Sequence, residues 1–185
     1  MFPSAIKSGS LVDQALIAAA ATSGALLAGA HIFQYFGYAP CALCLDQRQA
    51  HWTGLGLALA GVIFSAGFKW RRAAIATAGA CALVYLFSSG LAFYHAGVEN
   101  HFWPGPATCS GGGPVDIGEG SLLDIIGQKP SGPSCSDAAW RFLGVSMAGY
   151  NLLFSAGLFS ICLIAAALAA RDARNSSRHA QRIRK

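Results

Sequence analysis

Charged residues are scarce in this chain of 185 residues, and several long stretches contain almost none. Asp, Glu, Lys and Arg together make up 11% of the sequence, whereas hydrophobic residues make up 54%. A soluble globular chain typically carries about 25% charged residues. The composition therefore argues against a soluble domain and favours an integral membrane protein.

Four long apolar runs stand out, and no run alternates apolar and polar residues with a period of two, which argues against a β-barrel. Each run approaches the ~20 residues that a helix needs to cross a ~30 Å hydrocarbon layer. In lipid a single helix can pair its own backbone polar groups. The sequence thus predicts an all-α integral membrane protein, a four-helix transmembrane bundle with spans at about 13–34, 43–66, 72–95 and 141–170.

The positions of the basic residues predict the orientation of the bundle. Ten of the 13 basic residues precede the first span, fill the turn between the second and third, or follow the fourth: Lys7, Lys69, Arg71, Arg72, Arg171, Arg174, Arg178, Arg182, Arg184 and Lys185. By the positive-inside rule both termini and the tail 171–185 are cytoplasmic. This distribution also explains the net charge of +5 without a nucleic-acid partner, since the tail can contact anionic membrane lipid.

Two connections, about 35–42 and 96–140, then face outward, and they are periplasmic loops if the membrane is a bacterial inner membrane. The longer loop contains a short apolar patch, Ser121 to Ile126, which we expect to form a short interfacial helix. An alternative is that the first span is a signal peptide, but its apolar stretch exceeds the usual 7–15 residues.

The cysteines divide into two groups. Cys81 and Cys162 lie deep within spans, where a thiol behaves as a small buried hydrophobic group. Cys41, Cys44, Cys109 and Cys135 all lie at the outward connections, two at each. Because the periplasm is oxidising, disulfides persist on that side. The pairing stays open at this point, since four cysteines permit three connectivities.

The first outward pair lies at the start of the second helix, directly after Pro40. Backbone N–H groups and the positive end of the helix dipole stabilise a thiolate there, so we expect a lowered thiol pKa. Cys41, Cys44, Arg48 and His51 follow at helical spacing and share one stripe. Arg48 keeps its charge and needs an anionic or polar partner; it either serves a site or snorkels to the interface.

Two structural interpretations compete with redox chemistry. A zinc site would use Cys41 and Cys44 as half of its ligands, but Cys109 and Cys135 stand 26 residues apart with no second Cys-x-x-Cys beside them, so we expect no metal. Purely structural disulfides are the other possibility, although a Cys-x-x-Cys bridge closes a very small loop and adds little stability.

A redox-active pair of thiols requires an electron acceptor, and the sequence contains no haem motif, no Gly-x-Gly-x-x-Gly fingerprint and no iron–sulfur spacing. A lipid-soluble quinone, either ubiquinone or menaquinone, is the acceptor that can reach Cys44 from within the bilayer. Arg48 would stabilise negative charge on the sulfur or on the reduced quinone.

At these residues the chain closely resembles the DsbB family, the quinone-dependent oxidases of the bacterial disulfide-forming pathway. The resemblance covers most of the chain. It is carried by the segment from Pro40 to Leu45 with Arg48, by the segment from Trp103 to Cys109, and by Cys135 followed by the segment from Trp140 to Gly144.

The resemblance implies a route for electrons. Cys109 and Cys135 would form the disulfide that accepts electrons from DsbA, a periplasmic thioredoxin-fold protein, and exchange between the loops would reduce the Cys41/Cys44 pair. Cys44 would pass electrons to the quinone, with Arg48 at the ring and His95 also bordering it. Glu99 lies four residues after His95 and either tunes it or is an ordinary interfacial residue.

Two other functions remain as alternatives. The vitamin K epoxide reductase type also couples thiols to quinone, but its quinone-facing Cys-x-x-Cys comes late in the chain, opposite to the order here. A non-enzymatic four-span membrane scaffold with a disulfide-stabilised outer loop, as in tetraspanins, would leave Cys41, Cys44 and Arg48 unexplained.

Overall fold

The computed structural model describes residues 8–109 and 133–184, and four long helices account for most of them. They are α1 (Ser8–Tyr35), α2 (Ala42–Val62), α3 (Arg71–Glu99) and α5 (Met147–Ile183). A π-helical turn (Ile63–Gly67) extends α2. All four helices are long and apolar enough to cross a membrane, as the sequence predicts. The protein is a multi-pass, all-helical membrane protein.

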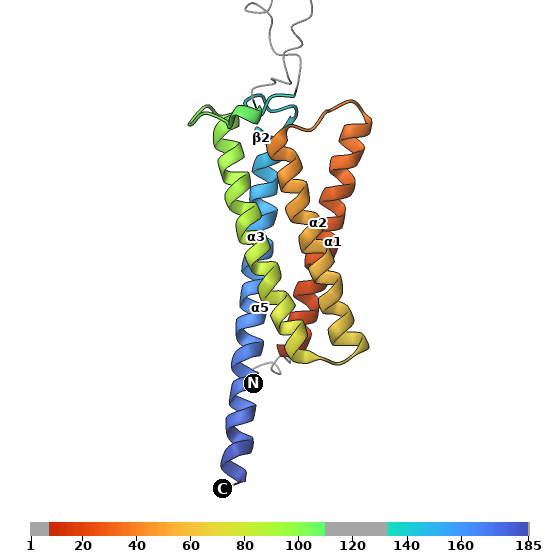
Figure 1. Cartoon of the computed structure of the whole chain (residues 1–185), viewed down its shortest axis with the longest axis vertical. Coiled ribbons are helices and arrows are strands. Elements are labelled where there is room, and N and C mark those ends of the chain that lie inside the picture. The colour runs from red at the N-terminus through yellow and green to blue at the C-terminus, as the bar shows by residue number, and fades with distance from the viewer. Residues whose placement is uncertain (1–7, 110–132, 185) are drawn as a thin grey trace, which may run out of the picture.

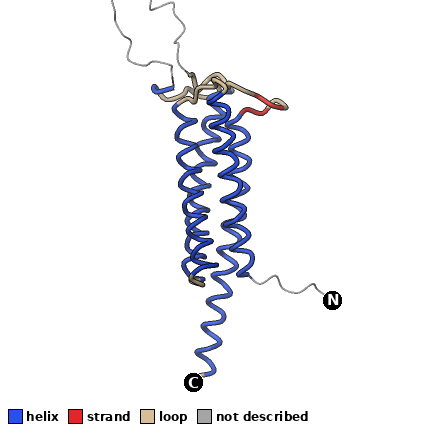
Figure 2. Tube along the Cα trace, turned by 90° about the vertical axis from the view of Figure 1, so that its right-hand side faces the viewer, coloured by secondary structure: helices blue, strands red, loops and turns tan. Residues whose placement is uncertain are grey.

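The helices form an antiparallel bundle in which α1 and α3 each pack against both α2 and α5 (Figure 1). The start of α1 and the end of α5 lie at one end of the bundle, and the connections that carry the cysteines lie at the other (Figures 1 and 2). Helices α2 and α5 face each other diagonally and are joined by polar side chains. The bundle interior therefore contains a polar layer between apolar ones.

Small residues dominate the apolar core, which allows the helices to approach closely. Alanines of all four long helices are buried there, together with Leu16, Tyr85 and Leu158. Large side chains such as Leu83, Phe87 and Ile164 point outward. This arrangement suits a bundle surrounded by lipid rather than by water.

Helix α5 differs from the expected last span at both ends. Residues 141–146 form a small antiparallel hairpin, β1 (Arg141–Phe142) and β2 (Val145–Ser146), before the helix begins at Met147. The turn residues Leu143 and Gly144 both have positive φ, as a tight two-residue hairpin turn requires. At the other end the helix continues to Ile183, so most of residues 171–185 are helical. The expected interfacial helix, Ser121 to Ile126, lies outside the described residues.

The outer end of the bundle has its own cluster of buried residues. Cys41, Cys109 and Cys135 pack with Leu43 and Val98. A short 3-10 helix, η2 (Ala107–Cys109), brings Cys109 to this cluster. The Cys135 backbone N–H donates a hydrogen bond to the Cys109 carbonyl at 3.3 Å.

Trp103 covers this cluster from the side of α3, and it requires a glycine beneath it. Its indole N–H donates to the Tyr94 carbonyl at 2.8 Å, and its ring stacks on Tyr94. A Cβ atom on Gly97 would lie 1.9 Å from the ring. Any side chain at position 97 would therefore displace the indole.

We predict that Gly97→Ala destabilises the outer end by about 1–3 kcal/mol, the usual cost of overpacking. The measurement is thermal unfolding in detergent. Gly90→Ala on the same helix is the matched control, because an added Cβ there meets nothing within 4 Å. Equal unfolding temperatures for the two variants would contradict this account of Trp103.

Candidate functional site

The four outward cysteines meet at one end of the bundle, where the structure has one oxidised and one reduced pair. Cys109 and Cys135 form a disulfide with a Cα–Cα distance of 5.1 Å. Cys41 and Cys44 are free thiols whose sulfurs lie 2.7 Å apart. The disulfide is the pair that the family resemblance implies. Cys81 and Cys162 are free and buried in the apolar core.

The two pairs lie in direct reach of each other. The Sγ atoms of Cys41 and Cys135 and a ring nitrogen of His95 all lie within 4.8 Å of one another. Cys135 is 1% exposed and Cys41 is 4% exposed, so this junction is shielded from bulk solvent. Thiol–disulfide exchange needs a thiolate beside a disulfide sulfur, and this arrangement supplies that proximity.

The same three residues are of types that also ligate zinc. A disulfide sulfur is not a thiolate, so Cys135 is a poor ligand as it stands. A closed structural zinc site takes four ligands, and this group offers three residues. The donor set therefore suits sulfur exchange better than a resident metal.

Cys41 caps the N-terminus of α2, as the preceding proline leads one to expect. Its sulfur accepts a hydrogen bond from the Cys44 backbone N–H at 3.3 Å. The sequence suggests a lowered thiol pKa for this pair, but the pKa of Cys41 itself is raised. The main cause is the side-chain hydrogen bond with Cys44, and burial adds to it. Cys41 therefore retains the proton that the two sulfurs share.

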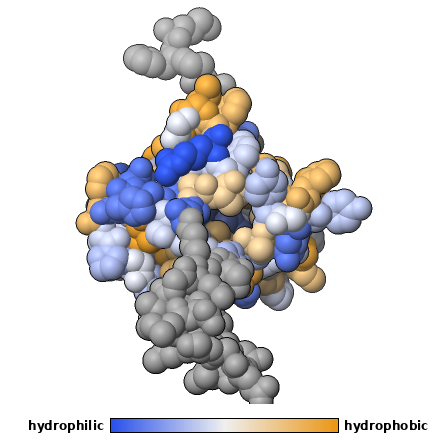
Figure 3. Space-filling model, turned by 90° about the horizontal axis from the view of Figure 1, so that it is seen from above, coloured by the Kyte–Doolittle hydropathy of each residue, from blue (hydrophilic) through white to orange (hydrophobic). Residues whose placement is uncertain are grey.

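A groove opens beside the reduced pair, between the outer parts of α1, α2 and α5. It has a volume of about 460 Å³ and apolar walls that include Phe33, Trp140 and Phe154. Its polar lining residues include Cys44, Arg48, His51 and His95. Figure 3 views this end of the molecule from above, where polar and apolar side chains adjoin. The volume and lining are typical of small-molecule sites.

Arg48 reaches across this groove to α1. Its Nη1 donates to the Gln34 side-chain oxygen at 2.5 Å, and its Nη2 donates to the Ala30 carbonyl at 2.9 Å. Within residues 8–109 and 133–184, no carboxylate forms an ion pair with it. The partners are neutral, so the guanidinium charge is held in place without being neutralised. The carboxylates of Glu99 and Asp137 also line the groove, but neither lies within ion-pair distance of Arg48, so an anion bound beside Arg48 would meet its positive charge.

His95 lies between the sulfurs and the polar interior. Its Nε2 is 3.6 Å from Cys41 Sγ and 3.9 Å from Glu99 Oε1. Glu99 also accepts a short hydrogen bond from Ser146, the residue that caps α5. Glu99 is 7% exposed, so it contacts the site rather than solvent. Of the two roles that the sequence leaves open for Glu99, the geometry favours contact with His95.

Sequence reasoning missed two residues of this end of the molecule, Gln47 and Asn151. Gln47 Nε2 lies 2.7 Å from His95 Nδ1, and Asn151 Nδ2 donates to Gln47 Oε1 at 2.6 Å. Each is a polar residue within a predicted apolar span. That alone was a usable signal, because a polar group within a membrane must find a partner.

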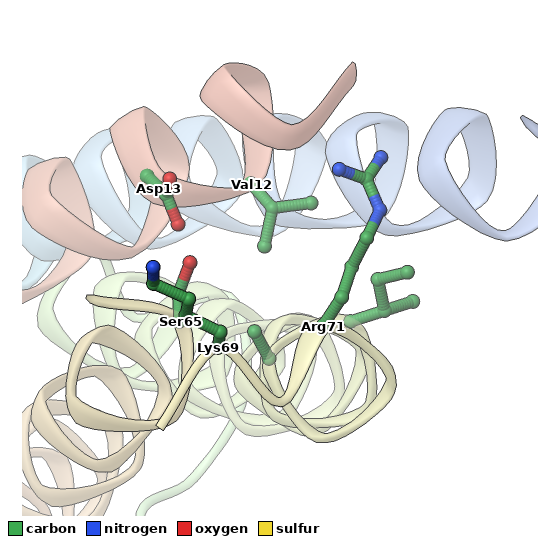
Figure 4. A pocket seen from close by; sticks show the side chains of 7 residues that line it. Val12, Asp13, Ser65, Lys69 and Arg71 are labelled. Carbon is green, nitrogen blue, oxygen red and sulfur yellow. The ribbon is translucent and has the colours of Figure 1, made fainter. Parts of the chain in front are cut away.

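A second hollow, of about 200 Å³, lies at the opposite end of the bundle (Figure 4). Asp13 from α1 points toward Ser65 and Lys69 of the turn between α2 and α3 (Figure 4). Its lining contains no cysteine. The outward cysteines pack together at the other end of the bundle.

A four-helix membrane bundle that holds a disulfide against a Cys-x-x-Cys pair belongs to the class of membrane thiol–disulfide oxidoreductases. The family model described as "Disulfide bond formation protein DsbB" matches residues 13–165. The chain therefore belongs to the DsbB family, whose members are membrane oxidoreductases of disulfide formation.

Two relatives agree with this assignment. Disulfide bond formation protein B of Aromatoleum aromaticum (strain DSM 19018 / LMG 30748 / EbN1) is 28% identical over 149 residues, which cover 79% of this chain and 87% of that protein. The uncharacterized protein RP370 of Rickettsia prowazekii (strain Madrid E) is 32% identical over 142 residues, 75% of each chain. No solved structure gives a significant match.

Because Cys41 retains the proton that it shares with Cys44, we predict the order in which these two thiols are alkylated. Only the thiolate reacts with iodoacetamide, and a raised pKa keeps Cys41 protonated to higher pH. Cys44 should therefore be labelled first near neutral pH. In Cys44→Ala the main cause of the raised pKa is gone, so labelling of Cys41 should move to lower pH. Peptide mass spectrometry measures both.

Cys81→Ala is the control for this experiment, because that thiol lies in the apolar core away from the pair. Its pH profile for Cys41 should match the wild type. Labelling of Cys41 ahead of Cys44, or an unchanged profile in Cys44→Ala, would contradict the proton assignment.

Proposed function

We propose that this protein oxidises a periplasmic DsbA-like dithiol protein and passes the electrons to a membrane quinone. The observation that carries the proposal is the approach of Cys135 Sγ to Cys41 Sγ, within 4.8 Å, at the edge of an apolar groove that Cys44 and Arg48 line. It joins the disulfide of the outer loop to a thiol pair at the edge of the groove. The positive-inside rule supports a periplasmic location for this end and cytoplasmic termini.

The first exchange involves the outer disulfide and the soluble partner. One thiolate of the partner attacks Cys109, the Cys109–Cys135 bond breaks, and the electron pair stays on Cys135. The partner's second thiolate then attacks the partner sulfur of the mixed disulfide, which leaves the partner oxidised and both loop cysteines reduced. Two electrons have entered the protein in this step.

The second exchange takes place at the buried junction. With Cys41 and Cys44 oxidised, the Cys135 thiolate attacks Cys41, a Cys41–Cys135 bond forms, and the electron pair leaves on Cys44. The Cys109 thiolate then attacks Cys135, which restores the outer disulfide and leaves Cys41 reduced. The disulfide and free-thiol pairs of the structure correspond to the end of this step.

The groove fits a quinone by its size, its apolar walls and its polar groups. A quinone bound there would accept two electrons and two protons as the Cys41–Cys44 disulfide forms again. Arg48 is placed to stabilise the Cys44 thiolate and the charge that develops on the acceptor, because its fixed positive charge acts in a poorly solvated setting. The overall change is two thiols and a quinone converted to a disulfide and a hydroquinone.

Purified protein should therefore oxidise DsbA thiols only when quinone is supplied, with one hydroquinone formed per disulfide. Cys44→Ser should abolish this turnover, because electrons on Cys41 would have no exit. A stopped assay of thiol content together with quinone absorbance measures both products. Normal turnover by Cys44→Ser, or turnover without quinone, would refute the mechanism.

Arg48→Gln should raise the KM for quinone and lower kcat, by tenfold or more together, because it removes the fixed charge while a polar side chain remains near Gln34 and Ala30. Each tenfold loss corresponds to about 1.4 kcal/mol. Arg178→Gln is the control: its side chain is exposed near the far end of α5 and does not line the groove. Equal losses in the two variants would assign Arg48 a merely structural role.

A further inference from the structure

A chain of hydrogen bonds crosses the bundle beneath the sulfurs. The direction in which these bonds run, from donor to acceptor, has a chemical consequence. The chain links one side chain to the next from α3 through α2, α5 and α2 again to α1 and back to α3. In this order its members are His95, Gln47, Asn151, His51, Ser23 and Tyr85, each at most 9% exposed. Polar groups at this depth are costly unless every one is paired.

At the outer end of the chain, the surroundings of His95 determine which ring nitrogen carries the proton. Nε2 faces Cys41 Sγ at 3.6 Å and a carboxylate oxygen of Glu99 at 3.9 Å. The backbone of Cys135 also interacts with the ring. Sulfur and carboxylate are acceptors here, so a neutral His95 places its N–H on Nε2. Its Nδ1 is then an acceptor.

That choice dictates the orientation of the two amides. Gln47 must donate its Nε2–H to His95 Nδ1, at 2.7 Å, which leaves its oxygen facing α5. Asn151 donates its Nδ2–H to that oxygen at 2.6 Å. The Asn151 oxygen then accepts from His51 Nε2 at 2.6 Å and from the Ser155 hydroxyl at 3.1 Å.

The hydrogen bonds at the far end of this chain run in the same donor-to-acceptor direction. His51 carries its proton on Nε2, so its Nδ1 accepts from the Ser23 hydroxyl at 3.0 Å. The Tyr85 hydroxyl has one proton for two acceptors, the Ser23 oxygen at 2.8 Å and the Ala19 carbonyl at 3.4 Å, and the shorter distance assigns it to Ser23. Every donor meets an acceptor, and reversing one amide would set two donors or two acceptors against each other.

We propose that Asn151, through Gln47 and supported by His51, is a positioning residue that holds His95 in the tautomer with its Nε2–H directed at Cys41. This inference rests on the proposed function and assigns the step that the hydrogen bond serves. When Cys109 attacks Cys135 of the Cys41–Cys135 disulfide, the S–S bond to Cys41 breaks and the electron pair stays on Cys41. A donor aimed at Cys41 stabilises that leaving thiolate.

Other charged and titratable groups surround His95 and must be considered in any pH measurement. Glu99 lies on the same helix, and Arg141 from the hairpin reaches the Glu99 carbonyl at 3.4 Å. Cys44 and Cys41 face it from α2. These groups stay in place when Asn151 is replaced by Asp, but the new carboxylate adds a charge. The tautomer of His95 is therefore the readout that reports the direction of the hydrogen bonds.

The test is Asn151→Asp, which keeps the shape of the side chain but removes its donor. An ionised Asp at this position still accepts from His51 but cannot donate to Gln47, whereas a protonated carboxyl would donate in place of the amide. The variant is therefore measured above the pH at which the new carboxyl titrates. The Gln47 amide must then reverse and present its oxygen to His95, which moves the His95 proton to Nδ1 and leaves a lone pair facing Cys41. The ¹⁵N chemical shifts of labelled histidine report this change of tautomer directly.

The second readout is alkylation of Cys41 with iodoacetamide as a function of pH, in a Cys44→Ala background that isolates its thiol. Asn151→Asp should move the midpoint to higher pH by about one unit, because the thiolate loses a donor. Gln47→Glu should move it in the opposite direction by a similar amount, because a carboxylate beside Nδ1 favours an imidazolium that still donates from Nε2. A loss of packing alone would not produce shifts of opposite sign.

Asn175→Asp is the matched control, since it makes the same change at an exposed position of α5. It should leave both the ¹⁵N shifts and the midpoint unchanged. An unaltered His95 tautomer in folded Asn151→Asp, or shifts of the same sign in both variants, would overturn the proposal. These measurements use resting protein without quinone, so their failure is distinguishable from a failure of quinone-dependent turnover.

Discussion

The approach of one disulfide sulfur to one thiol sulfur is the constraint on which the rest of the structure depends. Cys135 and Cys41 belong to segments far apart in the chain, yet their sulfurs lie within 4.8 Å in a site that is nearly closed to solvent. The outer loop achieves this by packing on Val98 and Leu43, under the cover of Trp103. Burial excludes stray thiols, and contact permits exchange.

The helices below this junction meet a second demand, which is to hold polar groups in an environment of low polarity. Arg48 is satisfied by an amide and a carbonyl of α1, so it keeps its charge available to the groove. His95 and His51 are satisfied by the amides between them. Replacing these residues by apolar ones could give an equally stable bundle, so their presence indicates function more than stability.

The sequence was sufficient to predict the four spans, because length and hydropathy alone decide whether a helix can cross lipid. It also placed the four outward cysteines at one end of the bundle. Two spans separate the first outward connection from the second, so the chain returns to the same side. It did not predict the hairpin at 141–146, because Phe142, Leu143 and Val145 look like a continuation of the last apolar run. The positive φ at Leu143 interrupts that run, and periodicity does not reveal it.

The site was predicted less completely than the fold. The stripe of Cys44, Arg48 and His51 does border one groove. The partners of these side chains depend on how α1 and α5 pack against α2, which a single helical pattern cannot specify. Asn151 stands 100 residues from His51, for example, and only the assembled bundle brings them together.

Sulfur exchange between Cys135 and Cys41 is most directly tested by trapping. In a Cys44→Ala, Cys109→Ala double variant, Cys41 and Cys135 are the outward cysteines that remain, and each lacks its usual partner. The account predicts that mild oxidation of membranes links Cys41 to Cys135 in nearly all molecules, as peptide mass spectrometry would show. Cys41 and Cys135 both left as free thiols, or cross-links between separate molecules, would contradict it.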